Sequence, residues 1–209
     1  MYVAKRSRRR QSRSSLPALL LYLFAVAPTL ADGRADIVSA TEEAKGVSSR
    51  DIKGEIERRE LELFRGAEIS LRRALTIAVE RHSGSRAVDI SFDGASGSPV
   101  YRVKTSKGAR ISEDTIDART GEIVGVAIES DARDLQIEDQ NNLVALKAVR
   151  LDISDAIPVA ERNAPGRAIS AGLTNDNGKL NFLIVVVSGN ELKQVILEPP
   201  AAKGQRNRH

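Results

Sequence analysis

Apolar residues recur at helical spacing in two stretches of the chain, and the two stretches are similar to each other. In ALTIAVERHSG (residues 74–84), apolar positions return every three or four residues before Gly84, and Ser70 is placed to cap the element. AIPVAERNAPG (residues 156–166) repeats this spacing and ends at Gly166. The pattern therefore predicts one amphipathic helix in each half of the chain, each followed by a glycine.

Segments of alternating apolar and polar residues follow each predicted helix, which is typical of strands. After the first helix they read AVDISFD, VYRVKT, ARISEDTIDA and IVGVAIE, with turns between them. After the second they read RAISAGL, KLNFLIVVV and ELKQVILEPP, with an NDNG hairpin turn at residues 175–178. Strands that follow one helix without further helices between them predict an antiparallel α+β unit and argue against a parallel nucleotide-binding sheet.

The repeat of helix and strands divides the chain of 209 residues into parts. Because a domain of about 60 residues hides only about 60% of its unfolded surface, we expect the two copies to pack together, helix or sheet against its partner. The predicted parts are a signal peptide (1–31), a polar and helical lead-in (32–67), a first unit (68–128), an acidic linker (129–142), a degenerate second unit (143–200) and a disordered basic tail (201–209).

The N-terminal segment has the order of a secretory signal peptide. A basic stretch without acids precedes the apolar run LPALLLYLFAVA (residues 16–27), and small residues follow at Thr29 and Ala31. We predict cleavage between Ala31 and Asp32, and a periplasmic or secreted location. The alternative is an uncleaved anchor, although the apolar run is shorter than the roughly 20 residues of a spanning helix.

If the signal peptide is removed, the net charge of the mature chain differs from that of the whole sequence. The whole chain carries +4, but residues 1–31 hold six cations and no acid, so the remainder carries −2. Leaving out the three cations of the tail gives −5 for residues 32–202. Nucleic-acid binding requires clustered basic residues on the folded surface, so the sequence predicts no nucleic-acid partner. Cysteine is absent, which excludes disulfides and thiol chemistry.

Three motifs of the first unit together resemble a PepSY domain, a bacterial envelope module of one helix against an antiparallel sheet. They are the helix with Ala74 and Ala78, the strand Tyr101-Arg102-Val103, and the ending Asp117-Ala118-Arg119-Thr120-Gly121. The resemblance implies an α+β fold of two PepSY-like units, each with one helix packed on a three- to four-stranded antiparallel sheet. It also implies a peptidase-regulating role, because PepSY units occur in propeptides of thermolysin-type metallopeptidases.

The second unit departs from this pattern. Phe182-Leu183-Ile184 replaces the Tyr-x-Val strand, and Pro199-Pro200 replaces the closing turn and stops the strand. Pro158 near the helix start is expected either to delay the helix or to kink it. The run LIVVV (residues 183–187) is predicted to be a strand covered on both faces, in preference to an exposed edge. If one unit carries a binding function, we expect it in the first.

The polar residues of the chain give no catalytic constellation. Asp117 is interpreted as a turn-setting residue, and His82, the one histidine outside the tail, as a cation at a helix end. Glu113 and Asp114 are adjacent on a strand and point to opposite faces, so they do not form a metal site with Asp117. The serines of HSGS and GASGS lie in glycine-rich turns without a nucleophile motif.

We therefore predict a protein that is not an enzyme and uses no cofactor, with no catalytic, cofactor-binding or metal-binding residue. Its predicted function is to bind another envelope protein, and the resemblance implies that this partner is a metallopeptidase. Masking of the peptidase cleft by an edge strand or a sheet face would be the mechanism. The alternative is an envelope sensor domain that binds a small ligand or a metal. The sequence identifies neither the binding residues nor the oligomeric state.

Overall fold

The computed structural model describes residues 3–4, 49–95 and 97–200. The predicted signal peptide, except Val3 and Ala4, the first part of the lead-in and the basic tail lie outside the described residues. The helices are α1 (Ser49–Arg65), α2 (Leu71–Arg81), α3 (Ile137–Leu146) and α4 (Ile153–Asn163), with a 3-10 helix at Ala132–Asp134. The strands are β1 (Val3–Ala4), β2 (Arg86–Asp93), β3 (Val100–Lys107), β4 (Arg110–Asp117), β5 (Ile128–Asp131), β6 (Arg167–Asp176), β7 (Lys179–Ser188) and β8 (Glu191–Glu198).

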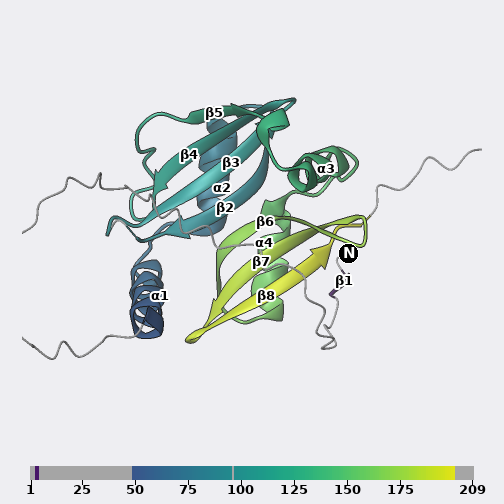
Figure 1. Ribbon diagram of the computed structural model, residues 1–209. Helices are drawn as coiled ribbons and strands as arrows, with labels where there is room; N and C mark the ends of the chain where they lie inside the picture. The colour runs from purple at the N-terminus through teal and green to yellow at the C-terminus, as the bar shows by residue number, and fades with distance from the viewer. Residues whose placement is uncertain (1–2, 5–48, 96, 201–209) are drawn as a thin grey trace, which may run out of the picture. The chain divides into compact units, whose positions relative to one another are not determined.

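One antiparallel sheet contains all the described strands, in the order β1-β8-β7-β6-β2-β3-β4-β5 (Figure 1). Each of two successive stretches contributes a helix followed by three strands, first α2-β2-β3-β4 and then α4-β6-β7-β8. The stretches join where β2 pairs with β6, with Ile90 opposite Ala171. The α+β class and the antiparallel sheet predicted from the sequence are confirmed. The assignment of residues 143–200 to a second PepSY-like unit stays a prediction.

Helices α2 and α4 lie on the same face of the sheet and cover its apolar side (Figure 1). Ser70 caps α2 by accepting a hydrogen bond from the Arg73 N–H at 3.2 Å, as its position predicts. Both helices turn small residues to the sheet, which lets the layers approach closely. These residues are Ala74, Ala78, Ala156 and Ala160, and all four are fully buried.

Aromatic residues of the first stretch form a short row in the core. The rings of Phe64 and Phe92 meet edge to face at 5.3 Å, and those of Phe92 and Tyr101 at 5.7 Å. The Tyr101 hydroxyl donates to the Ile69 carbonyl at 2.7 Å, so the polar end of the buried ring has a hydrogen-bond partner. Through Phe64 this row also fixes the end of α1, the helix predicted in the lead-in.

Residues 123–142 differ most from the sequence-based expectation. IVGVAIE was predicted to be a strand, but its first part makes a single bridge from Ile123 to Ile116, and β5 begins only at Ile128. Gly125 has a φ of 75°, which interrupts the extended conformation. The expected acidic linker contains most of β5, the 3-10 helix and the start of α3.

Pro158 lies inside α4 and does not delay its start. The helix begins directly after Asp152, whose N–H donates to the Asp155 carboxylate at 2.9 Å. Strand β7 holds the LIVVV run between β6 and β8, so the run is internal to the sheet and does not form an exposed edge. Pro199 and Pro200 follow the end of β8, as the loss of their backbone donors predicts.

Candidate functional site

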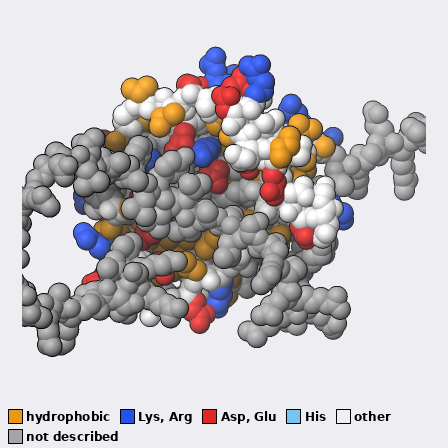
Figure 2. Space-filling view, in the orientation of Figure 1, with side chains coloured by type: hydrophobic (Ala, Val, Ile, Leu, Met, Phe, Trp, Pro, Cys, Tyr) orange, Lys and Arg blue, Asp and Glu red, His pale blue; other side chains and the backbone are white. Residues whose placement is uncertain are grey.

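Exposed apolar side chains gather between β4 and β5, in residues 123–128, which we call the apolar segment. Val126 is 88% exposed and Ile128 63% exposed, and Ile123 and Val124 are also exposed. These are four of the eight large hydrophobic residues that are exposed in the described part of the chain. Figure 2 shows hydrophobic side chains at the upper left, over this region of Figure 1. Exposed apolar residues that cluster mark interaction surfaces more often than single ones do.

The turn that precedes the apolar segment is built around Asp117. One oxygen of its carboxylate accepts the N–H groups of Arg119 and Thr120, each at 2.8 Å. These hydrogen bonds hold the pKa of Asp117 below its ordinary value. Gly121 completes the turn with a φ of 77°, a backbone conformation that residues with a Cβ rarely adopt. The turn-setting role predicted for Asp117 is therefore confirmed.

The apolar segment is held at both ends and leaves the sheet between them. At its start the Val124 N–H donates to the Thr115 carbonyl at 2.8 Å. At its end Ile128 pairs with Glu113 as β5 joins the edge of β4. Val126 therefore stands on a short arch with fixed ends, which presents its side chain to solvent.

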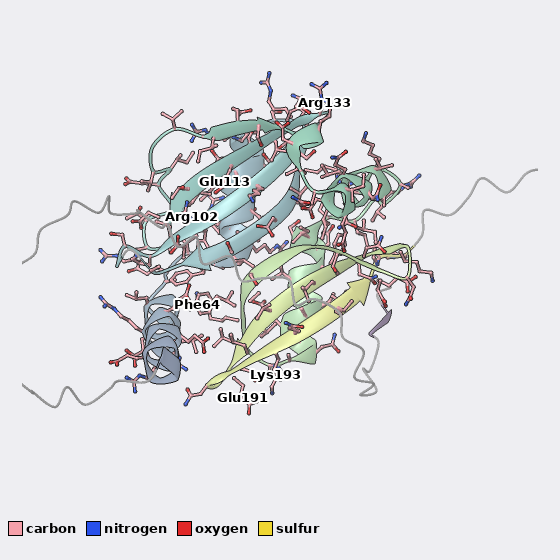
Figure 3. The ribbon with its side chains drawn as sticks, in the orientation of Figure 1. Phe64, Arg102, Glu113, Arg133, Glu191 and Lys193 are labelled. Atoms are coloured by element: carbon pink, nitrogen blue, oxygen red, sulfur yellow. The ribbon has the colours of Figure 1, made fainter. Side chains whose placement is uncertain are left out.

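An ionic row lies on the face of β2, β3 and β4 opposite α2. Arg102 contacts Asp93 at 2.8 Å and Glu113 at 3.9 Å, and Lys104 contacts Glu113 at 3.8 Å. Figure 3 shows Arg102 and Glu113 on the side of these strands turned to the viewer. Exposed pairs of this kind contribute about 0–1 kcal/mol each. The row balances its own charges and offers no cluster of free cations for a phosphate.

Asp89 lies on the same face, at the junction of the two stretches of the sheet. It pairs with Gly172 of β6, and a Cβ at Gly172 would stand 2.8 Å from the Asp89 carboxylate. Burial raises the pKa of Asp89 to about 6, with smaller contributions from Glu113 and Asp139, while Lys104 opposes the shift. Only a glycine opposite leaves room for this carboxylate.

We expect Asp89→Asn to stabilise the protein at neutral pH. Because the folded pKa of about 6 exceeds the ordinary 3.8, the folded chain holds this proton more tightly, and the contribution to stability is lost as pH rises through 6. The variant should match the parent near pH 3.5 and exceed its free energy of unfolding by about 3 kcal/mol above pH 7. Urea unfolding across this pH range measures the difference. Asp93→Asn, four residues farther along β2 on the same face, is the control. An Asp89→Asn curve parallel to that of the parent would refute the assignment.

A buried carboxylate lies under the helix face at the end of α2. Asp114 of β4 is fully buried, and its oxygens lie 2.8 Å from His82 Nε2 and 3.4 Å from Arg81 Nη1. Sequence reasoning placed His82 at a helix end but did not identify its partner, because the two residues are brought together only by packing of α2 on the sheet. One histidine and one carboxylate are too few ligands for a zinc site.

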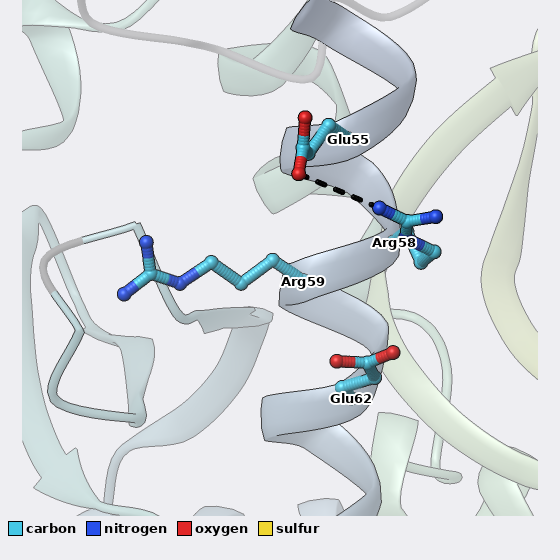
Figure 4. A pocket seen from close by; sticks show the side chains of 4 residues that line it. All are labelled: Glu55, Arg58, Arg59 and Glu62. Atoms are coloured by element: carbon cyan, nitrogen blue, oxygen red, sulfur yellow. Dashed lines mark hydrogen bonds and ion pairs between the residues drawn. The ribbon is translucent and has the colours of Figure 1, made fainter.

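Other features of the described residues suggest no ligand or metal site. A shallow hollow on α1 is lined by Glu55, Arg58, Arg59 and Glu62, with Glu55 and Arg58 paired at 3.5 Å (Figure 4). Within the described ranges, no three histidine, cysteine or acidic side chains are placed to hold a metal. No helix among the described residues is long and apolar enough to cross a membrane.

The apolar segment was missed by sequence reasoning, which predicted residues 123–129 to be a short strand of the first unit. A signal was present, because Val124, Val126 and Ile128 alternate around Gly125, and a glycine inside a strand pattern often marks a departure from the sheet.

Comparison with known proteins identifies one domain. Residues 68–127 match the family model described as the peptidase propeptide and YPEB domain, PepSY. A search of curated proteins finds no match to the chain. A solved structure of a protein from Clostridium difficile 630, provisionally described as a lipoprotein, is similar over 65% of this chain and 91% of that one, with 17% identity and a TM-score of 0.38.

Proposed function

We propose, from the presence of a PepSY domain at residues 68–127, that this protein is exported, binds a peptidase and regulates it without catalysing a reaction itself. The family description names peptidase propeptides, which associate with a peptidase domain. The observation that carries the proposal is the exposed apolar segment, which lies within this domain up to residue 127 and ends at Ile128, the first residue of β5.

The contact we propose is made by the apolar segment and the adjoining edge of β5. Val126 and Ile128 would bury their exposed side chains against the peptidase, which supplies a hydrophobic contribution of about 25 cal/mol per Å² of apolar area. The fixed ends of the arch reduce the conformational entropy lost on binding. Strand β5 could also pair along its outer edge with an extended segment of the partner, and access to the cleft would then be restricted.

Replacing Val126 and Ile128 together by Asp should weaken the complex by about 100-fold or more, because two charges would be buried without partners. The measurement is the Kd of the exported protein for a co-resident exported metallopeptidase, by calorimetry or surface-based binding. Both side chains are exposed in the free protein, so the thermal unfolding of the variant should stay close to that of the parent.

The matched control is Ile137→Asp with Val144→Asp, two equally exposed aliphatic residues of α3 outside the PepSY domain. This variant should bind like the parent. Equal loss in both variants would point to a general loss of surface hydrophobicity, and no loss in either would exclude the apolar segment as the contact.

A further inference from the structure

Strand β8 forms the outer edge of the second half of the sheet. Its inner edge pairs with β7 from Glu191 to Leu197, while its outer edge pairs with β1 at Leu197 and Glu198. Among the described residues, no strand pairs with the outer edge from Glu191 to Ile196. Free N–H and C=O groups in such an edge are a template for a further strand.

The side chains of β8 are arranged symmetrically about Gln194. Leu192 and Ile196 stand two residues to either side of it and are 52% and 42% exposed. Both lie on the face opposite α4, because Leu197, which has the other parity, is buried under the helices. They extend an apolar row of β7, since Leu192 pairs with Val187 and Ile196 with Leu183.

We propose that a second copy of the chain pairs antiparallel with the stretch of β8 from Leu192 to Ile196, about a two-fold axis through Gln194, which leaves Leu197 and Glu198 paired with β1. In this register Leu192 lies opposite Ile196 of the partner subunit, and Ile196 lies opposite the partner subunit's Leu192. Gln194 lies opposite Gln194 of the partner subunit, and the side-chain amide of each can both donate and accept a hydrogen bond. An axis perpendicular to the sheet keeps the helices of both copies on one side, so the two sheets continue as one and the contact is closed.

The neighbouring registers are less favourable. An axis through Val195 places Leu192 opposite Glu198 of the partner subunit, and an axis through Lys193 brings the two Lys193 ammonium groups directly opposite each other. With the axis at Gln194, the ammonium group of each Lys193 stays 3.8 Å from the Glu191 carboxylate of its own strand. The exposed apolar pairs are therefore matched in one register and mismatched in the next.

The opposite edge of the sheet lacks these properties. Strand β5 has four residues and carries Glu129 and Asp131. Acidic residues on a short edge oppose self-pairing. The proposed contact at β8 is separate from the apolar segment, so it does not rest on the proposed peptidase binding, and either can fail without the other.

Single cysteines test the register, because the chain has none of its own. We expect Gln194→Cys to form a disulfide-linked dimer under mild oxidation, since residues directly opposite in an antiparallel pair have Cα atoms about 4.5–5.5 Å apart. Leu192→Cys is the matched control on the same face. Its copy lies four residues along the strand, about 13 Å away, beyond the reach of a disulfide. The full chain, including its own N-terminal segment, is expressed in a bacterial host that exports it, and the purified protein is tested without further processing.

Light scattering of the cysteine-free parent supplies an independent readout. We expect a dimer at tens of micromolar, and a folded monomer for Leu192→Lys with Ile196→Lys. A parent that is monomeric at every concentration would overturn the proposal. Equal crosslinking of Gln194→Cys and Leu192→Cys would also overturn it, because it would exclude an axis at Gln194.

Discussion

Gly166→Ala is expected to lower the free energy of unfolding by about 3 kcal/mol. An added Cβ would overlap the Val187 carbonyl oxygen and stand 2.8 Å from the Val187 carbonyl carbon and 3.0 Å from a methyl of Val186. The first two atoms belong to the backbone of an internal strand, so the clash is relieved only if α4 moves away from β7. Urea unfolding followed by circular dichroism measures the change.

Gly84→Ala is the matched control, because Gly84 lies three residues after the end of α2, as Gly166 lies three residues after the end of α4. Its Cβ would meet only the flexible end of Lys107, at 3.5 Å, and the cost comes from its φ of 80°. That cost is about 1 kcal/mol. Equal effects at the two positions would contradict the close approach of Gly166 to β7.

Removing both basic side chains that contact Asp114 is expected to have an effect of similar size. Arg81→Ala with His82→Ala leaves the fully buried Asp114 carboxylate without either of its ion-pair partners. An uncompensated buried charge costs about 3–5 kcal/mol. Thermal and urea unfolding measure the loss. Arg72→Ala with Arg73→Ala, two exposed residues of the same helix, should change stability by less than about 1 kcal/mol.

A third substitution separates the charge from the packing of the two removed side chains. Asp114→Asn in the Arg81→Ala, His82→Ala background removes the buried charge and should recover most of the lost stability. If this triple variant were as unstable as the Arg81→Ala, His82→Ala double variant, the lost stability would be due to packing, and the ion pairs would have no large role.

The local parts of the fold follow from the sequence because their causes are local. Helical spacing, Ser70 as a cap and the glycines at 84 and 166 are enough to place α2 and α4. The Asp117 turn is also local, since its hydrogen bonds reach only two or three residues along the chain.

The joining of the two halves could not be predicted in the same way. The pairing of β2 with β6 brings together Ile90 and Ala171, which no local pattern connects. The raised pKa of Asp89 depends on that junction, and the ion pairs of Asp114 depend on how α2 lies over β4. Alternation within one strand gives the face of a residue and does not give its neighbours on other elements.

The candidate binding site could not be predicted from the sequence for the same reason. Sequence reasoning expected a binding function in the first unit and identified no residue for it. Gly125 is a sequence signal that the strand is interrupted, but the exposure of Val126 and Ile128 depends on what the rest of the chain covers, which a local pattern does not give. The pattern IVGVAIE does not distinguish a covered strand from an exposed arch.

The most direct test of the central claim is the rate of peptide hydrolysis by a co-resident exported metallopeptidase as this protein is added. We expect a saturable change in rate at a stoichiometry of one PepSY domain per peptidase, and no change with the Val126→Asp, Ile128→Asp variant. A rate that stays constant at high molar excess of the unmodified protein would contradict the claim.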